Sequence, residues 1–253
     1  MKFKDLFSGH ASDYARFRPR YPAPLFAWLA RLVPRHELAV DVGSGNGQAA
    51  TALAGYFARV MAIDPSGSQL AQGEPLPNVE YRKAAAEETG LDDGVADLMV
   101  AAQALHWFDH QAFFSEARRV VRPAGALVVW CYGLTHVTAE IDGLVHELYE
   151  DQLGAYWDPE RRLVENGYRS IAVPFEELAS PAFEIQTSWT LAELVGYLGT
   201  WSALKRYVAE HASAAGPESE SPLELMFPRL ERAWGPTAER LVSLPLSVRA
   251  FRL

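Results

Sequence analysis

Cysteine and long apolar segments are scarce in this chain of 253 residues. Cys131 is the only cysteine, so no disulfide can form within the chain, and a reducing cytoplasmic environment is expected. No apolar run approaches the ~18 residues that span a bilayer, and residues 1–5 lack the apolar core of a signal peptide. The sequence therefore predicts a cytoplasmic protein that does not cross a membrane.

Positive charge is also in deficit. The chain has 23 Lys and Arg against 32 Asp and Glu, a net charge of −9, which disfavours a nucleic-acid partner because phosphates require a basic face. The motif H-E-x-x-H and paired cysteines are absent, so no metal is expected. We expect a single domain that acts on a small molecule, as a monomer or a homodimer.

The most informative stretch is the octet at residues 40–47, Val-Asp-Val-Gly-Ser-Gly-Asn-Gly. It follows apolar residues and precedes good helix formers, which is the strand–turn–helix context of a nucleotide-binding loop. Gly43, Gly45 and Gly47 allow the backbone to turn sharply and to approach a ligand. Asp41 would repel a pyrophosphate but could hold a cationic ligand, directly or through water. The octet therefore predicts a site for a nucleoside without phosphates.

Asp64 ends the next apolar segment, 17 residues after Gly47. A carboxylate at the tip of the second strand can accept both hydroxyls of a ribose, and the spacing is near the offset of about 20 residues typical of such folds. The alternative is a helix N-cap, because Asp-Pro-Ser commonly opens a helix. The ribose role is the favoured hypothesis.

Strands and helices alternate from residue 38 to residue 132. The expected helices in this part lie at 47–57, 66–73, 84–89 and 109–121. Such alternation implies a parallel sheet with helices on both faces, and ligands bind beyond the carboxyl ends of its strands. Asp41, Asp64, Glu87 and Gln103 lie at those ends and are predicted to converge on one site.

These motifs resemble those of class I S-adenosylmethionine-dependent methyltransferases, in particular the small-molecule type-11 group that includes trans-aconitate methyltransferase-like proteins. The acid-x-G-x-G-x-G motif of the family is matched by residues 41–47, and its ribose acid by Asp64. Its adenine segment, Asp-Ala-Glu, corresponds to residues 85–87, so Ala85 stands where the family has an acid. Residues 104–108, Ala-Leu-His-Trp-Phe, are close to the A-x-H-W-F of the group. The match is strong over residues 3–132 and weaker beyond.

The resemblance implies an α/β fold, with a doubly wound, seven-stranded, mostly parallel Rossmann-like sheet, an antiparallel last strand and a helical lid insertion. The single methyltransferase domain, residues 1–253, would comprise an N-terminal arm and helix (1–37), a donor-binding core (38–132), the lid (133–180) and C-terminal strands and helices (181–253). The sixth strand is expected at 183–189, and the seventh, an edge strand, at 246–253. Further helices are expected at 139–153, 191–199, 201–211 and 223–234.

The implied cofactor is S-adenosyl-L-methionine, with a small molecule, favoured as a carboxylic acid, as the methyl acceptor. The predicted cofactor-binding residues are Asp41, Gly43, Ser44, Gly45, Asp64, Pro65, Ala86, Glu87, Gln103, His106 and Trp107. The predicted acceptor-binding residues are Arg18, Tyr21, Trp157, Arg161 and Tyr168. An aromatic wall with arginines suits a small acid, since a guanidinium can grip a carboxylate through two hydrogen bonds. If the acceptor must lose a proton, His106 and Tyr14 are the predicted catalytic residues, with Tyr132 as a further candidate.

Several alternatives stay open at this point. Arg161 could belong to a solvated helix face, Trp107 could fill the core beside Phe108, and the arm that carries Tyr14 and Arg18 could be packed only by its aromatic residues. A nicotinamide-dependent dehydrogenase is disfavoured by the G-x-G-x-G spacing. A non-catalytic protein that binds S-adenosylmethionine is the other alternative, because a fold does not guarantee a function.

Overall fold

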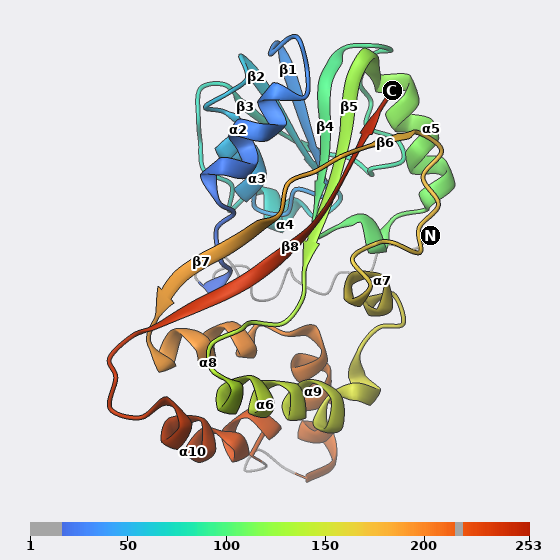
Figure 1. Ribbon diagram of the computed structural model, residues 1–253. Coiled ribbons are helices and arrows are strands. Elements are labelled where there is room, and N and C mark those ends of the chain that lie inside the picture. The colour runs from blue at the N-terminus through green and yellow to red at the C-terminus, as the bar shows by residue number, and fades with distance from the viewer. Residues whose placement is uncertain (1–16, 216–219) are drawn as a thin grey trace.

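The computed structural model describes residues 17–215 and 220–253. A sheet flanked by helices forms the upper part of Figure 1, and a group of helices forms the lower part. No helix in the described ranges is long and apolar enough to cross a bilayer. The predicted α/β fold with a Rossmann-like, mostly parallel sheet is confirmed.

Five parallel strands form the centre of the sheet, in the spatial order β3-β2-β1-β4-β5. Their bounds are β1 (Leu38–Val42), β2 (Arg59–Asp64), β3 (Val79–Lys83), β4 (Ala96–Ala102) and β5 (Val121–Tyr132). Every residue of β1 is buried, as expected for a parallel strand that is covered on both faces. The strand order reverses at β1, so a ligand crevice is expected beyond the carboxyl ends of β1 and β4.

Helices cover both faces of this sheet because the side chains of each strand alternate. Leu98 and Val100 of β4 pack in one core cluster with α2 (Ala23–Arg31) and α3 (Gln48–Leu53). The intervening Met99 packs in a second cluster with α5 (His110–Val120). Helix α4 (Gly67–Leu70) follows β2. The helices predicted at 47–57, 66–73 and 109–121 therefore form, although α3 and α4 are shorter than expected.

The last strand does not lie at an edge of the sheet, which corrects the prediction for 246–253. Strand β8 (Arg240–Arg252) begins earlier, and its second half pairs antiparallel with β5. Its other side pairs with β6 (Glu176–Leu178) near its end and with β7 (Phe183–Trp189) near its start. The length of β8 permits all three pairings, so this strand is interior. The range of β7 agrees with the predicted sixth strand, whereas β6 was not anticipated.

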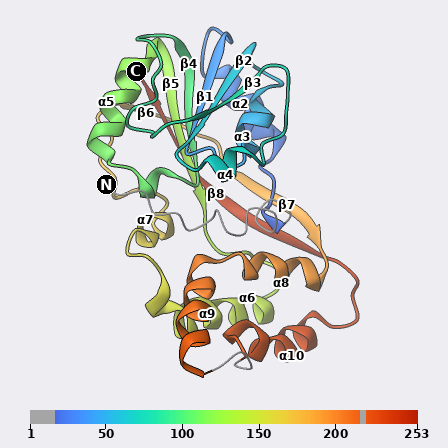
Figure 2. The ribbon, with the colours of Figure 1, turned by 180° about the vertical axis from the view of Figure 1, so that it is seen from behind.

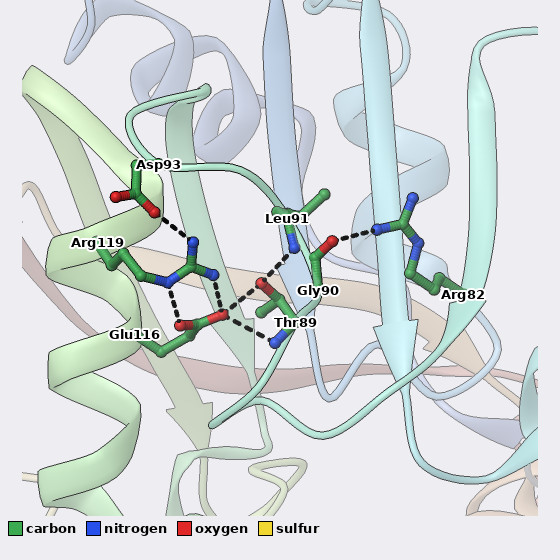
Figure 3. Close-up of polar contacts among 7 residues, drawn as sticks. All are labelled: Arg82, Thr89, Gly90, Leu91, Asp93, Glu116 and Arg119. Atoms are coloured by element: carbon green, nitrogen blue, oxygen red, sulfur yellow. Dashed lines mark hydrogen bonds and ion pairs between the residues drawn. The ribbon is translucent and has the colours of Figure 1, made fainter.

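The helix predicted at 84–89 is wrong. Ala85 and Glu88 instead form an isolated antiparallel bridge around a turn. Figure 3 shows what holds the following residues: one oxygen of Glu116 accepts from both the backbone nitrogen (2.9 Å) and the hydroxyl (2.6 Å) of Thr89, and Arg119 binds Glu116 from the same helix. Burial raises the pKa of Glu116, but the bonds from Arg119 and Thr89 outweigh it and leave the pKa lowered. These tertiary bonds fix a turn where local helix propensity favours a helix.

The helical group in the lower part of Figure 1 lies beyond the carboxyl end of β5, and Figure 2 shows the same arrangement from behind. Its elements are α6 (Ala139–Glu147), π-helix η3 (Leu148–Gln152), 3-10 helix η4 (Gly154–Tyr156), α8 (Leu191–Gly199), α9 (Ser202–Ala215) and α10 (Pro222–Trp234). Helix α7 (Arg161–Glu165) lies above this group in Figure 1, and its Val164 belongs to the same core cluster as Met99. Helix α10 contacts both α6 and α8, and buried Leu144, Leu198 and Leu230 belong to one apolar cluster. The group thus combines helices from both sides of the predicted lid boundary at residue 180.

Candidate functional site

The glycine loop between β1 and α3 can be made only with glycine at its first position. Gly43 has a φ of +65°, in the left-handed region that side chains disfavour. A Cβ atom at Gly43 would lie 2.5 Å from the Cβ of Ala104, which is closer than real atoms approach. Gly45 and Gly47 also have positive φ angles, +55° and +82°. The loop therefore packs closely against the segment after β4, and its glycines have no side chains to cover the backbone.

Asp64 is fixed rigidly at the end of β2. Its Oδ2 accepts the backbone N–H of Gly45 and its Oδ1 accepts that of Ser66, both at 2.8 Å. The hydroxyl of Ser66, not Asp64, caps α4, since it accepts from Gln69 at 3.4 Å. The N-cap interpretation of Asp64 is therefore wrong. The residue is 8% exposed and lines a cavity.

Asp41 lies beneath the glycine loop and does not line that cavity. It is 0% exposed, and its Oδ2 accepts the backbone N–H of Ala50 at 3.0 Å. Its Oδ1 has no hydrogen-bond partner among the described residues. Burial raises the pKa of Asp41 to about 8, the negative charge of Asp64 adds to this shift, and the bond from Ala50 opposes it. The predicted direct contact of Asp41 with a ligand is therefore not supported.

A cavity of about 480 Å³, called the large cavity here, opens at the carboxyl ends of the strands. Its lining includes these residues predicted to bind the cofactor: Gly43, Ser44, Gly45, Asp64, Pro65, Ala86, Glu87, Gln103 and Trp107. Lining residues that the sequence did not single out include Asn46, Gln69, Glu88, Asp109 and Ala112. The volume suits one ligand of cofactor size. Segments that follow β1, β2, β3 and β4 thus meet at one place, as the sequence predicted.

The polar groups in the large cavity fit a nucleoside. The hydroxyl of Ser44 and Oε1 of Gln69 are buried without a hydrogen-bond partner among the described residues, and both residues line the cavity. Buried polar atoms are usually satisfied, so these atoms are candidates to bond a polar ligand. Across the cavity, Oε1 of Glu87 accepts the backbone N–H of Asp109 at 2.7 Å. Glu87, Glu88 and Asp109 line the cavity and carry carboxylates, whereas the side chain of Ala85 has no acceptor.

Gln103 is committed to the protein rather than open to a ligand. Its φ is +56°, an uncommon conformation for a residue with a side chain. Its amide nitrogen donates to the carbonyl of Tyr132 at 3.1 Å, and its amide oxygen accepts the N–H of Tyr132 at 3.3 Å. This pair of bonds ties the end of β4 to the end of β5. Gln103 lines the large cavity, but both atoms of its side-chain amide are bonded to Tyr132. Its predicted role as a cofactor ligand is therefore not supported for the side-chain amide.

A second cavity, of about 70 Å³ and called the small cavity here, adjoins the large one. It is lined by Arg18, Gln103, His106, Trp107, Trp157, Asp158, Arg161, Tyr197, Trp201 and Ser202. Arg18, Gln103 and Trp107 line both cavities, so the two cavities are neighbours. Tyr197 of α8 and Trp201, which directly precedes α9, were missed by the sequence analysis because they lie outside the predicted lid.

Arg161 is built into the wall of the small cavity. Its Nε donates to the hydroxyl of Tyr149 at 2.8 Å, and its guanidinium carbon lies 5.0 Å from the ring centroid of Trp157. Tyr149 also donates to a carboxylate oxygen of Glu165 at 2.5 Å. Arg162, in contrast, is exposed. The interpretation of Arg161 as part of a solvated helix face is therefore wrong. Its two terminal nitrogens make no hydrogen bond to a described residue, and Arg161 lines the small cavity.

The N-terminal arm enters the site through Arg18 and Tyr21, while the predicted Tyr14 lies outside the described residues. A terminal nitrogen of Arg18 donates to the hydroxyl of Tyr132 at 3.0 Å, and the guanidinium lies 5.5 Å from the ring centroid of Tyr197. Tyr21 lines the large cavity and meets Trp130 edge-on. The arm therefore contributes a second cation to the small cavity.

His106 lines the small cavity and is 8% exposed. Its Nδ1 lies 2.9 Å from the hydroxyl of Tyr168. Burial lowers the pKa of His106 to about 3, and the positive charges of Arg161 and His110 add to this. Tyr168 is 0% exposed and lines neither cavity. Its predicted direct contact with an acceptor is therefore not supported, and it contacts His106 instead.

His106 and His110 are four residues apart, so the chain does contain an H-x-x-x-H spacing of the kind that paired metal ligands have. Nδ1 of His106 faces Tyr168, and Nε2 of His110 bonds the carbonyl of Leu105 at 3.1 Å. Within residues 17–215 and 220–253, no group of three or more His, Cys, Asp or Glu is arranged to hold a metal ion. The pair is engaged with the protein.

Comparison with known proteins gives a consistent family assignment. A type-11 family described as a methyltransferase domain matches residues 40–129. A Dictyostelium discoideum protein named as a methyltransferase is 35% identical over 226 residues, which cover 88% of this chain and 86% of that protein. An uncharacterized methyltransferase of Mycobacterium tuberculosis is 36% identical over 157 residues, 61% of each chain. A solved structure from Anaeromyxobacter dehalogenans, named as a type II methyltransferase, is 44% identical, covers 93% of this chain and 98% of that chain, and has a TM-score of 0.84.

Proposed function

We propose that this chain, which belongs to the class I S-adenosylmethionine-dependent methyltransferases of the type-11 group, methylates the carboxylate of a small acid. It is a methyltransferase, and its cofactor is S-adenosylmethionine, as predicted. The dehydrogenase and non-catalytic alternatives are therefore set aside. The acceptor, the cytoplasmic location, the oligomeric state and the likeness to trans-aconitate methyltransferase-like proteins stay predictions.

The residues around the large cavity suit the donor. Asp64 is oriented to accept the ribose hydroxyls, the glycine loop permits close approach, and Trp107 and Gln103 line both the large and the small cavity. When bound, the donor supplies an electrophilic methyl group on a sulfonium. Methyl transfer is an in-line displacement, so the main task of these residues is alignment of the two reactants and exclusion of water.

The single observation that carries the acceptor proposal is the placement of Arg161. The guanidinium is held by Tyr149 and Trp157 in a small cavity that shares Arg18, Gln103 and Trp107 with the large one. A guanidinium matches the geometry of a carboxylate and binds it with charge-assisted hydrogen bonds. A cavity of about 70 Å³ favours an acid of few atoms.

The state of His106 supports an acceptor that is already ionised. With its pKa lowered to about 3 by burial and by nearby positive charge, the imidazole is a weak base at neutral pH, because an efficient general base has a pKa near the working pH. A carboxylate needs no base before it attacks, whereas a phenol or an ammonium does. We therefore assign binding, rather than proton removal, to the histidine predicted as catalytic.

Replacement of Arg161 by alanine tests this proposal. With an acceptor drawn from a panel of small carboxylic acids, we expect Arg161→Ala to lower kcat/KM by about 10- to 100-fold, the cost of one charge-assisted hydrogen-bonding group. Donor affinity, measured by calorimetry with S-adenosylhomocysteine, should change by less than about 3-fold. Arg162→Ala is the matched control, since Arg162 is exposed. Unchanged kcat/KM in Arg161→Ala would exclude the arginine as the acceptor ligand.

A further inference from the structure

Tyr168 occupies a strained position that is held from several sides. Its φ is +62°, which is rare for a bulky residue. The preceding Gly167 also has a positive φ, and a Cβ there would lie 2.6 Å from the hydroxyl of Ser247. Arg249 of β8 donates to the carbonyls of Tyr168 (2.6 Å) and Ile171 (2.9 Å). Strain of this kind persists only where the surroundings enforce it, and it is common at functional sites.

The hydroxyl of Tyr168 has one hydrogen-bond acceptor among the described residues, Nδ1 of His106, which lies 2.9 Å away. Tyr168 is 0% exposed. A buried hydroxyl needs an acceptor for its hydrogen, so this hydrogen is directed to Nδ1 of His106, which lies in the 3-10 helix η2 (Leu105–Trp107). Burial raises the pKa of Tyr168 well above its ordinary value, which keeps that hydrogen in place.

The other ring nitrogen of His106 faces the small cavity. A neutral imidazole carries one N–H, and a ring whose Nδ1 accepts must be protonated on Nε2. Nε2 makes no hydrogen bond to a described residue and is not among the buried atoms that lack a partner, while His106 lines the small cavity. The cavity is thus offered an N–H group, beside the guanidinium of Arg161.

We propose that Tyr168 is a positioning residue that holds His106 as the Nε2–H tautomer, so that His106 offers the small cavity a hydrogen-bond donor and not a base. This inference rests on the proposed function for the identity of the molecule that receives those donors. Two donors side by side, His106 and Arg161, select a group with two acceptor oxygens. The carboxylate of Asp158 also lines the cavity but is paired with Arg206 at 2.7 Å, so an ammonium group would have to compete with that ion pair.

Nitrogen-15 NMR of the full chain labelled at histidine tests the tautomer directly, because protonated and unprotonated ring nitrogens resonate in different regions. We expect Nε2 of His106 to be protonated and Nδ1 to be unprotonated, and we expect a scalar coupling between the hydroxyl proton of Tyr168 and Nδ1. Tyr168→Phe should convert the single tautomer to a mixture. Tyr149→Phe is the matched control: it removes a hydroxyl that contacts Arg161 but not His106, and the tautomer should stay the same.

Sodium acetate and methylammonium chloride then serve as probes of the small cavity. We expect acetate to shift the Nε2–H resonance saturably and methylammonium to leave it unchanged. A protonated Nδ1 in the wild-type protein, or an unchanged tautomer in folded Tyr168→Phe, overturns the inference. If Tyr168→Phe does not fold, the wild-type scalar coupling decides, and its absence counts against Tyr168. An Nε2–H tautomer without any response to acetate would support the positioning role of Tyr168 and contradict the carboxylate acceptor, so the two failures are distinguishable.

Discussion

Asp41 and Asp64 are both buried beside the glycine loop, but the protein stabilises only one of their charges. Asp64 accepts two backbone N–H groups, whereas Asp41 accepts one and has an unpartnered Oδ1. Hydrogen bonds to a carboxylate favour its charged form, and burial disfavours it. The two acids therefore have different tasks. Asp64 lines the large cavity, and burial favours the protonated form of Asp41.

The proton on Asp41 should make the ligand-free protein less stable as pH rises. Burial raises the pKa of Asp41 from 3.8 to about 8, so between these values the folded state holds a proton that the unfolded state has lost. The free energy of unfolding then falls with rising pH across this window, by at most about 1.4 kcal/mol per pH unit for one proton. In urea titrations from pH 5 to pH 8, Asp41→Asn should show a shallower fall than the wild type. Equal slopes would mean that Asp41 is ionised in the folded protein.

Replacement of Asp64 by asparagine should weaken donor binding. The change keeps the size of the side chain but removes the charge and one acceptor, at a cost of about 1.5–3 kcal/mol for charge-assisted bonds, which is roughly 10- to 100-fold in Kd. Calorimetry with S-adenosylhomocysteine gives the measurement. Asp92→Asn is the control, because Asp92 is exposed and lines neither cavity. A Kd that does not change in Asp64→Asn would remove Asp64 from the donor site.

The glycine loop is the element whose shape the donor site most requires. Gly43→Ala would place a Cβ 2.5 Å from that of Ala104 at a φ of +65°, so the loop must shift. We expect Gly43→Ala to abolish measurable donor binding and to lower the melting temperature. Gly143→Ala makes the same chemical change in α6, where a Cβ meets nothing within 4 Å, and should stabilise the protein by about 0.5–1 kcal/mol. Thermal melts and calorimetry of both variants compare the sites, and normal donor affinity in Gly43→Ala would contradict the geometry.

Elements with strong local signals were predicted correctly from the sequence. Strand β7 and helix α8 match their expected ranges, 183–189 and 191–199; α8 begins with a capping box between Thr190 and Glu193, which is a local device. The helix expected at 84–89 fails for the opposite reason. Bonds to Glu116, distant in sequence, fix a turn there, and local propensity carries no information about them.

The arrangement of the whole molecule explains which site residues the sequence could locate. The donor side lies at the ends of consecutive parallel strands, so motif spacing predicted its convergence. The small cavity instead combines the arm, η2, the segment around Trp157 and helices α8 and α9. Residue spacing alone does not determine how such helices pack. The sequence analysis selected Trp157 and Arg161, which line the small cavity, and missed Tyr197 and Trp201, which also line it. It also selected Tyr168, which does not line the cavity and contacts His106 instead.

The central claim is that this methyltransferase esterifies a small carboxylic acid. The most direct measurement incubates the wild-type protein with S-adenosylmethionine labelled in its methyl group and a mixture of small metabolites, followed by mass spectrometry of labelled products before and after mild alkali. We predict a labelled product of low mass that loses its label to alkali as methanol, which is the behaviour of a methyl ester, and that Arg161→Ala forms much less of it. A labelled product that resists alkali, as an N-methyl or C-methyl compound does, would contradict the claim.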